Sequence, residues 1–331
     1  MSAGSSLPYR LRPNKAVDRE LFLSLLMRLA PALSLEKYHY VGLGGPFLED
    51  FRLVHARLGV ARMTCLETEE QVHKRQLFNR PIASIECVHK ALEDYLDGID
   101  FEVPAIVWFD YTEPKGITTQ IERFAQTVGT VPLGSVLRVT LNANPASLGK
   151  PDHNELSVEI EGEASSDRAA KPTIQEWRLA RFKARLGTLF PSGMTAEGMS
   201  LKTYGPSLLR ALKLAVEKEM LSFRDRRIVW ALGTHYADGQ AMVTAALVVC
   251  AAADTTIEPL VKGWEFHTTP ESPHRLDLPA LSTLERLAME SNDDVKAKMA
   301  FDLPRSDMGE DPITVFKKFY RIYPHFSRVE L

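Results

Sequence analysis

Three short stretches of this chain carry residue types that suit the binding of a nucleoside. Gly42, Gly44 and Gly45 form one turn after a β-forming segment, Glu67 follows 22 residues after Gly45, and Asp110 ends an apolar run. Glycines let the backbone turn tightly and approach a ligand, and the start of the next helix offers unpaired N–H groups to a negative group. An acid about twenty residues later accepts hydrogen bonds from ribose hydroxyls in folds of this kind. The spacing therefore favours a nucleoside ligand over a βα turn that binds nothing.

The elements that must position these residues alternate between strand and helix. Apolar and β-branched runs predict strands near 38–41, 61–66, 82–88, 104–110 and 134–141. Helical spacing predicts helices at 47–58, 69–79 and 117–128, with a short helix or turn at 89–96. A helix at 206–221 precedes two strands, 227–234 and 241–251, whose connection contains Asp238-Gly239, a hairpin signal. We expect an α/β fold with a doubly wound, mostly parallel seven-stranded sheet that ends in an antiparallel C-terminal hairpin.

The pattern divides the chain into three parts. Residues 1–34 form an N-terminal helical segment with a helix near 18–30, and residues 35–252 form the α/β domain. Within that domain the alternation breaks at 146–204, which we interpret as a cap insertion with an acidic strand at 155–161. Residues 253–331 form a C-terminal extension, in which leucines between 278 and 287 predict one more helix. Arg12 and Lys15 precede the first helix and either reach a ligand at the sheet or remain solvated, as isolated charges near a chain end usually do.

Composition excludes several classes of protein. The net charge of −3 gives no global attraction to nucleic acid or anionic membrane, and the longest apolar run, 241–253, is too short to span a bilayer. The three cysteines, Cys65, Cys87 and Cys250, are far apart and predict packing thiols in a reducing compartment. Histidines are scattered without a close cluster of acids or thiols, so we expect no metal site. Together these features predict a cytoplasmic protein without a membrane segment.

The order of elements over residues 35–252 resembles the class I S-adenosylmethionine-dependent methyltransferase superfamily, and especially a group described as putative O-methyltransferases. Val41-Gly42-Leu43-Gly44-Gly45 looks like the motif that turns beneath the methionine part of the cofactor, and Glu67 matches the acid that holds the ribose. Asp110-Tyr111-Thr112-Glu113-Pro114 falls where the fourth strand delivers catalytic or substrate-facing residues. The resemblance implies S-adenosylmethionine as cofactor, with the cofactor-binding residues Gly42, Gly44, Gly45, Glu67, His89 and Asp110 and the catalytic residues Asp110, Tyr111 and Glu113.

Methyl transfer from a sulfonium requires alignment of acceptor, methyl and sulfur, and in some cases a base for the acceptor proton. Asp110 is the first choice to orient or deprotonate the acceptor, with Tyr111 and Glu113 shaping the site; the alternative is that Asp110 only caps the following turn. His235 and His89 are further bases, although a lone histidine beside a turn more often packs or is solvated. The proline-containing motif of DNA amino-methyltransferases is absent, and no cysteine follows a proline as in cytosine-C5 enzymes.

For the methyl acceptor and the partners the sequence supports more than one alternative. The segment 168–185 is basic and carries Trp177 and Phe182, so it either binds a phosphate-bearing substrate or forms a solvated helix face, and nucleic acid is not favoured. Tyr40 and Pro46 depart from the superfamily motif, which leaves a catalytically degenerate subunit or adaptor as the alternative function, with the C-terminal extension as the partner surface. A different doubly wound enzyme using a dinucleotide is a third possibility, disfavoured by the terminal hairpin.

Overall fold

The computed structural model describes residues 12–151, 172–291, 299, 301–305 and 309–323. Its centre is one eight-stranded sheet in the order β3-β2-β1-β4-β5-β7-β6-β8. The antiparallel strand is β7, which pairs with β5 on one side and β6 on the other, while the remaining pairings are parallel. The strands are β1 (His39–Gly42), β2 (Arg62–Glu67), β3 (Ile85–His89), β4 (Ala105–Asp110), β5 (Val136–Asn142), β6 (Arg226–Ala237), β7 (Ala241–Ala251) and β8 (His274–Leu276).

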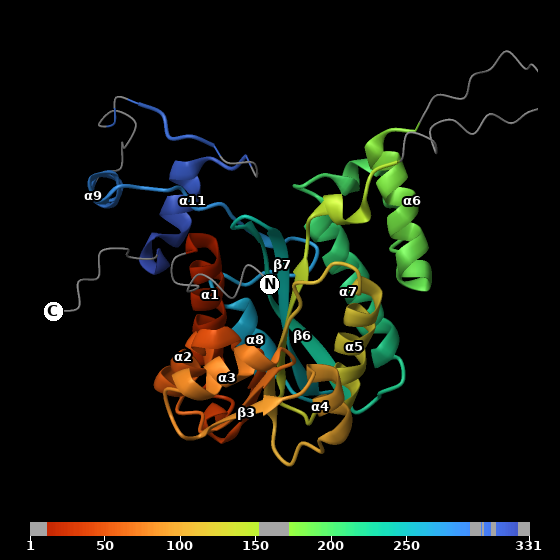
Figure 1. Ribbon diagram of the computed structural model, residues 1–331, viewed down its shortest axis with the longest axis vertical. Coiled ribbons are helices and arrows are strands. Elements are labelled where there is room, and N and C mark those ends of the chain that lie inside the picture. The colour runs from red at the N-terminus through yellow and green to blue at the C-terminus, as the bar shows by residue number, and fades with distance from the viewer. Residues whose placement is uncertain (1–11, 152–171, 292–298, 300, 306–308, 324–331) are drawn as a thin grey trace, which may run out of the picture.

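Helices cover both faces of this sheet (Figure 1). On one face lie α1 (Pro13–Leu29), α2 (Glu49–Leu58), α3 (Glu70–Asn79) and α8 (Ile257–Lys262); on the other lie α4 (Leu92–Gly98), α5 (Ile117–Thr130) and α7 (Tyr204–Met220). Helix α6 (Ile174–Leu186) packs against the 3-10 turns Pro145–Leu148 and Ala196–Met199. Two further helices, α9 (Thr283–Ser291) and α11 (Pro312–Phe319), belong to the C-terminal extension. The architecture is the doubly wound α/β fold expected from the sequence.

The local sequence explains why several of these strands and helices form and where they begin or end. From Ala105 to Phe109 every residue of β4 is buried, as expected of a central parallel strand covered on both faces. Gly59 ends α2 in the left-handed conformation, with φ of 71°, which is the usual role of a glycine after a helix. The first turn of α6 has a capping box between Thr173 and Glu176.

Several expectations need correction. The first helix begins at Pro13 and not near residue 18, so Lys15 lies within it rather than before it. The sheet has eight strands and not seven, because β8, a three-residue segment of the C-terminal extension, pairs in parallel with β6. The predicted turn at 235–240 is shorter, since β6 continues to Ala237 and His235 lies within it. The helix predicted from leucines at 278–287 begins only at Thr283, and β3 begins at Ile85 rather than at residue 82. The predicted acidic strand at 155–161 lies outside the described residues.

Two apolar cores fill the space between the sheet and its helices. The first lies under α1 and α2 and contains Leu21 and Phe22, and the second lies under α5 and α7 and contains Phe124 and Leu212. Among the described residues, none of the helices combines the length and the apolar character that a bilayer crossing requires.

Candidate active site

The residues singled out in the sequence lie at one edge of the sheet. Strands β1, β2, β3 and β4 are parallel, so their carboxyl ends face the same way, and each is followed by a predicted site residue or ends in one. Glu67 and His89 are direct neighbours across β2 and β3, and Asp110 is paired with Thr140 of β5. The structure therefore brings the glycine turn, Glu67, His89 and Asp110 to a common edge.

The structure favours glycine at two positions of the turn, Gly44 and Gly45. A Cβ on Gly44 would lie 2.8 Å from Cε2 of Phe51 and 2.9 Å from Sγ of Cys65, so no larger residue fits there without movement. Gly45 has a φ of 53°, in the left-handed region that favours glycine. Gly42 was predicted to belong to the turn but is the last residue of β1, and a Cβ there would make only ordinary contacts, the nearest at 3.5 Å.

Two side chains of α3 donate hydrogen bonds to backbone carbonyls of the turn. Gln76 donates to the carbonyl of Gly45 at 3.1 Å, and Asn79 donates to the carbonyl of Pro46 at 2.7 Å. Pro46 belongs to a 3-10 turn, Gly45–Phe47, and α2 itself begins at Glu49, slightly later than the sequence predicted. The backbone at the turn is thus fixed before any ligand arrives.

Glu67 is half-buried and anchored by its own turn. Its Oε1 accepts hydrogen bonds from the backbone amides of Thr68 and Glu69, both at 2.9 Å. His89 is exposed, contacts the carbonyl of Thr68 through Nε2 at 2.9 Å, and stacks on His73 with ring centroids 5.3 Å apart. Two fixed amides on one oxygen orient the carboxylate at the edge where a nucleoside sugar would lie.

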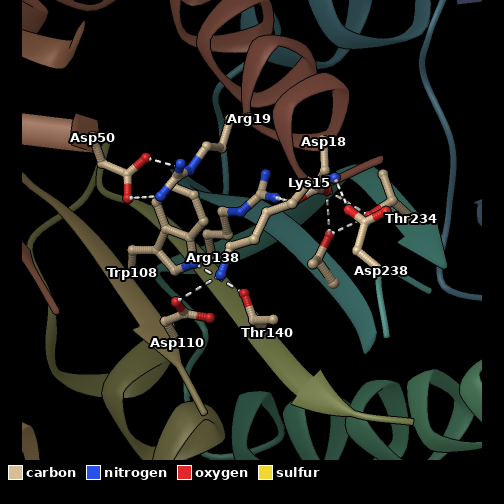
Figure 2. Close-up of polar contacts among 11 residues, drawn as sticks. Lys15, Asp18, Arg19, Asp50, Trp108, Asp110, Arg138, Thr140, Thr234 and Asp238 are labelled. Carbon is tan, nitrogen blue, oxygen red and sulfur yellow. Dashed lines mark hydrogen bonds and ion pairs between the residues drawn. The ribbon is translucent and has the colours of Figure 1, made fainter. Parts of the chain in front are cut away.

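Asp110 points toward α1, where it meets a lysine from the start of that helix (Figure 2). Nζ of Lys15 lies 3.5 Å from Oδ2 of Asp110, and the side chains are only 10% and 12% exposed. Oδ1 of Asp110 is buried and has no hydrogen-bond partner among the described residues. An unsatisfied carboxylate oxygen in a buried position is costly, and a cationic ligand group would remove that cost.

Tyr111 and Glu113 do not join Asp110. Tyr111 turns to the opposite face of the sheet, where its hydroxyl donates to Oε1 of Glu93 at 2.8 Å. Burial, helped by the charge of Glu93, raises the pKa of Tyr111 far above its ordinary value, so the phenol stays protonated. Glu113 is exposed and accepts the amide of Lys115 at 3.1 Å within its own loop.

A polar network beneath α1 was not anticipated from the sequence (Figure 2). Arg19 forms an ion pair with Asp50 of α2, in which Nε lies 2.6 Å from Oδ1 and Nη2 donates to Oδ2 at 2.8 Å. Burial raises the pKa of Asp50, and the Arg19 charge opposes that rise. Asp18 pairs with Arg138 of β5, and both side chains are almost fully buried. The available signal was the cluster of Lys15, Asp18 and Arg19 on a helix otherwise occupied by core leucines.

His235, the alternative base, lies near the carboxyl end of β6, but its side chain faces α7, on the side of the sheet opposite to Asp110. It is fully buried, and its ring lies so close to α7 that a Cβ on Gly205 would be 2.7 Å from it. Neither ring nitrogen has a hydrogen-bond partner among the described residues. Burial, with a smaller contribution from the charge of Arg275, lowers the pKa of His235 to about 4. Within the described residues no three His, Cys, Asp or Glu side chains are grouped so that they could hold a metal ion.

The basic segment is partly accounted for by structural contacts. Within α6, Arg178 donates to the carbonyl of Gly149 at 3.3 Å and Arg185 to that of Ser147 at 3.2 Å. Arg181 covers the ring of Trp177 at 4.8 Å. Two of the helix cations thus donate to backbone carbonyls of the segment that follows β5. Residues 168–171 of the basic segment lie outside the described residues.

A comparison with known protein families shows to which family this chain belongs. A family model described as "putative O-methyltransferase" matches residues 7–331, nearly the whole chain. The chain belongs to this family. Its membership confirms the resemblance to putative O-methyltransferases that the order of elements indicated, and the α/β fold agrees with it. A search of curated proteins gave no match.

Solved structures with a related arrangement are distant in sequence. An rRNA methylase from Streptococcus thermophilus is 11% identical, with 70% of this chain and 96% of that chain covered and a TM-score of 0.35. A putative O-methyltransferase from Klebsiella pneumoniae is 13% identical, with 70% and 80% covered and a TM-score of 0.36. The N-methyltransferase NodS from Bradyrhizobium japonicum is 8% identical, with 71% and 97% covered and a TM-score of 0.35. Similarity at these values supports no inference about substrate.

Proposed function

We propose that this member of the family is an S-adenosylmethionine-dependent methyltransferase that acts on an oxygen or nitrogen of a small molecule, nucleotide or protein. The observation that carries the proposal is the common edge at which the glycine turn, Glu67 and the Lys15–Asp110 pair meet. Nucleoside ligands of open α/β sheets bind at the carboxyl ends of the strands, where this edge lies.

The residues at this edge match the parts of the donor in chemistry. Glu67 has a second carboxylate oxygen beyond the one bound to its own turn, and that oxygen suits the ribose hydroxyls. The amino-acid tail of the donor carries an ammonium and a carboxylate. Asp110, with its unsatisfied Oδ1, suits the ammonium, and Lys15 suits the carboxylate. The donor itself supplies the activated methyl group, and the chain supplies orientation of donor and acceptor.

In this proposal Asp110 binds the donor, whereas the first prediction from the sequence was that it orients or deprotonates the acceptor. Because a lysine ammonium lies 3.5 Å from its carboxylate, Asp110 is better placed to bind a charged group than to take a proton from an acceptor. Tyr111 and Glu113 remain predicted site residues, now with supporting positions beside Glu93 and Lys115. In this proposal they shape the rim rather than contact the methyl group.

Isothermal titration calorimetry with S-adenosylhomocysteine tests the proposal. We expect the wild-type chain to bind, and Glu67→Gln and Asp110→Asn each to weaken binding by about tenfold or more, since hydrogen bonds to charged groups contribute roughly 1.5–3 kcal/mol. Glu102→Gln is the matched control, because this exposed carboxylate pairs with Arg62 at the start of β2, the end opposite to Glu67, and it should leave the affinity unchanged. Absence of both heat and thermal shift with the wild-type chain would show that the proposal is wrong.

A second candidate function is a catalytically inactive subunit that assembles through the C-terminal extension. The observation in its favour is an open hollow of about 390 Å³ lined by apolar residues, among them Leu284, Leu287 and Phe301, which are 79%, 53% and 55% exposed. Exposed apolar groups of this kind often mark interaction surfaces. This candidate predicts a stable complex that survives both Glu67→Ala and Asp110→Ala. Methyl transfer by the purified chain alone, abolished by those substitutions, would exclude it.

A further inference from the structure

The ion pair between Asp18 and Arg138 lies at the centre of the interface between α1 and the sheet. The side chain of Arg138 is 0% exposed and that of Asp18 is 1% exposed, and Nη2 of Arg138 donates to Oδ2 of Asp18. Oδ1 of Asp18 accepts from the hydroxyls of Thr234 at 2.6 Å and Thr244 at 3.2 Å. One helical carboxylate is therefore bound to β5, β6 and β7 at once.

Aromatic rings fix the arginine of this pair from two sides. The guanidinium carbon of Arg138 lies 4.4 Å from the ring centroid of Trp108 and 4.6 Å from that of Phe22 on α1. The indole of Trp108 is itself held, since its Nε1 donates to Oγ1 of Thr140 at 3.0 Å. Nε and Nη1 of Arg138 have no hydrogen-bond partner among the described residues, so the guanidinium is incompletely satisfied.

Such a pair is a poor source of stability. Transfer of two charges from water to a protein interior costs several kcal/mol per ion, and apolar replacements of buried pairs are often neutral or stabilising by about 1–4 kcal/mol. The unsatisfied nitrogens of Arg138 increase that cost. What a buried pair offers, and the leucines of α1 do not, is a single permitted position of the helix, because its hydrogen bonds are directional.

That position matters one turn earlier on the same helix. Lys15 precedes Asp18 by three residues and so lies on the same side of α1, roughly 4.5 Å further along its axis. The backbone amide of Lys15 donates to Oδ2 of Asp238 at 2.8 Å, and its Nζ lies 3.5 Å from Asp110. A slip of α1 by one residue, about 1.5 Å with a rotation of about 100°, would separate Lys15 from Asp110.

We propose that Asp18 and Arg138 are positioning residues, which fix the rotation and height of α1 on the sheet so that Lys15 lies against Asp110. This inference rests on the proposed function, because Lys15 and Asp110 are the groups assigned to the amino-acid tail of the donor. It makes α1 a part of the ligand site, although the helix precedes the first strand of the sheet. Neither positioning residue contacts the ligand.

The test replaces the pair by side chains that cannot form directional bonds. In the Asp18→Leu/Arg138→Met double variant, Thr234 and Thr244 keep a partner, since their hydroxyls already lie 2.7 Å apart. Two ligands are titrated by calorimetry: S-adenosylhomocysteine, which has the amino-acid tail, and 5′-methylthioadenosine, which lacks it. Thermal unfolding is measured in parallel, and each titration is repeated with Lys15→Met added.

A matched control is available on the same helix. Glu20 of α1 forms a partly exposed bidentate pair with Arg57 of α2, with distances of 2.5 and 3.0 Å. The Glu20→Gln/Arg57→Gln double variant removes this surface pair without touching the interface with the sheet. It should leave both ligand affinities unchanged.

We expect the Asp18→Leu/Arg138→Met variant to unfold at the wild-type temperature or higher, to bind S-adenosylhomocysteine about tenfold more weakly, and to bind 5′-methylthioadenosine as the wild type does. Addition of Lys15→Met should then cost nothing further, whereas in the wild-type background it should cost about tenfold. Wild-type affinity for both ligands with full sensitivity to Lys15→Met would overturn the inference. Equal loss for both ligands would also overturn it, because that result indicates general damage to the site.

The experiment also distinguishes two other results: a double variant that does not fold, and a wild-type chain that binds neither ligand. If the double variant does not fold, Thr234→Val is tested instead, since it removes the 2.6 Å hydrogen bond to Asp18 at constant side-chain shape. It should weaken the binding of S-adenosylhomocysteine relative to that of 5′-methylthioadenosine, by less than the double variant would. An unchanged ratio of the two affinities would refute the positioning role. If the wild-type chain binds neither ligand, the proposed function fails, and that result is distinct from failure of the double variant alone.

Discussion

Substitution of His235 by leucine should flatten the pH dependence of stability in the acid range. His235 is fully buried on β6, its ring nitrogens have no hydrogen-bond partner among the described residues, and burial lowers its pKa from 6.5 to about 4. Because the folded pKa lies below the unfolded value, the unfolded chain takes up the proton first. The free energy of unfolding that depends on a neutral His235 is therefore fully present above pH 6.5 and is lost as the pH falls from 6.5 towards 4.

The magnitude follows from the two pKa values. Proton linkage with 6.5 for the unfolded and 4 for the folded state gives a loss of about 2 kcal/mol in the free energy of unfolding between pH 7 and pH 5 from this one residue. His39 and His274 are also buried with a pKa lowered to about 4 and contribute in the same direction. Asp50 and Asp238, whose pKa values are raised by burial, act in the opposite direction. The difference between wild type and His235→Leu isolates the single residue.

Urea unfolding followed by tryptophan fluorescence at pH 7 and pH 5 measures this difference. We expect the wild type to lose about 2 kcal/mol more than His235→Leu over that interval. Val243→Ala is the control: Val243 is the cross-strand neighbour of His235 on β7, and its truncation lowers stability without removing an ionisable group. Its pH dependence should parallel that of the wild type. Identical pH dependence of His235→Leu and the wild type would refute the reasoning.

Two other substitutions test the packing that supports the site. Gly44→Ala should lower the free energy of unfolding by about 1–3 kcal/mol, because its Cβ would lie 2.8 Å from Phe51, and a thermal scan without any shift would contradict the tight fit. Arg19→Met should cost roughly 3–5 kcal/mol by leaving the buried carboxylate of Asp50 unpaired. Chemical denaturation measures this loss, and Arg19→Met combined with Asp50→Leu should recover most of it; no recovery would show that the pair is not the cause.

The periodicity of apolar residues and the composition were sufficient to predict the architecture of the α/β domain. The predictions of β4 and of the hairpin at Asp238-Gly239 are confirmed, because a strand buried on both faces and a three-residue turn containing glycine are specified by adjacent residues. The eighth strand was missed because β8 has only three residues, and its pairing with β6 depends on the path of the extension rather than on its own sequence. The helix predicted from residue 278 was placed too early for a similar reason: Leu278 is buried in the core without being helical.

The candidate site was predictable only where topology alone decides proximity. Glu67 and Asp110 reach the same edge because parallel strands place their carboxyl ends together, so residues at strand ends are adjacent whatever the details of packing. Tyr111 and Glu113 follow Asp110 in sequence but not in space, because side chains alternate between faces along a strand and the loop then leaves the sheet.

The sequence by itself determined that Glu67 and Asp110 come at the ends of β2 and β4 and that glycines allow the turn after β1, since these depend on local propensity and on steric limits within a few residues. Only the tertiary structure decided that Lys15 lies against Asp110 and that Asp18 pairs with Arg138, 120 residues away in the chain. A charge in an isolated helix is most stable in water. These charges are buried because α1 packs on the sheet with its leucines inward, and the partners they find there are set by the position of the helix and not by any neighbouring residue.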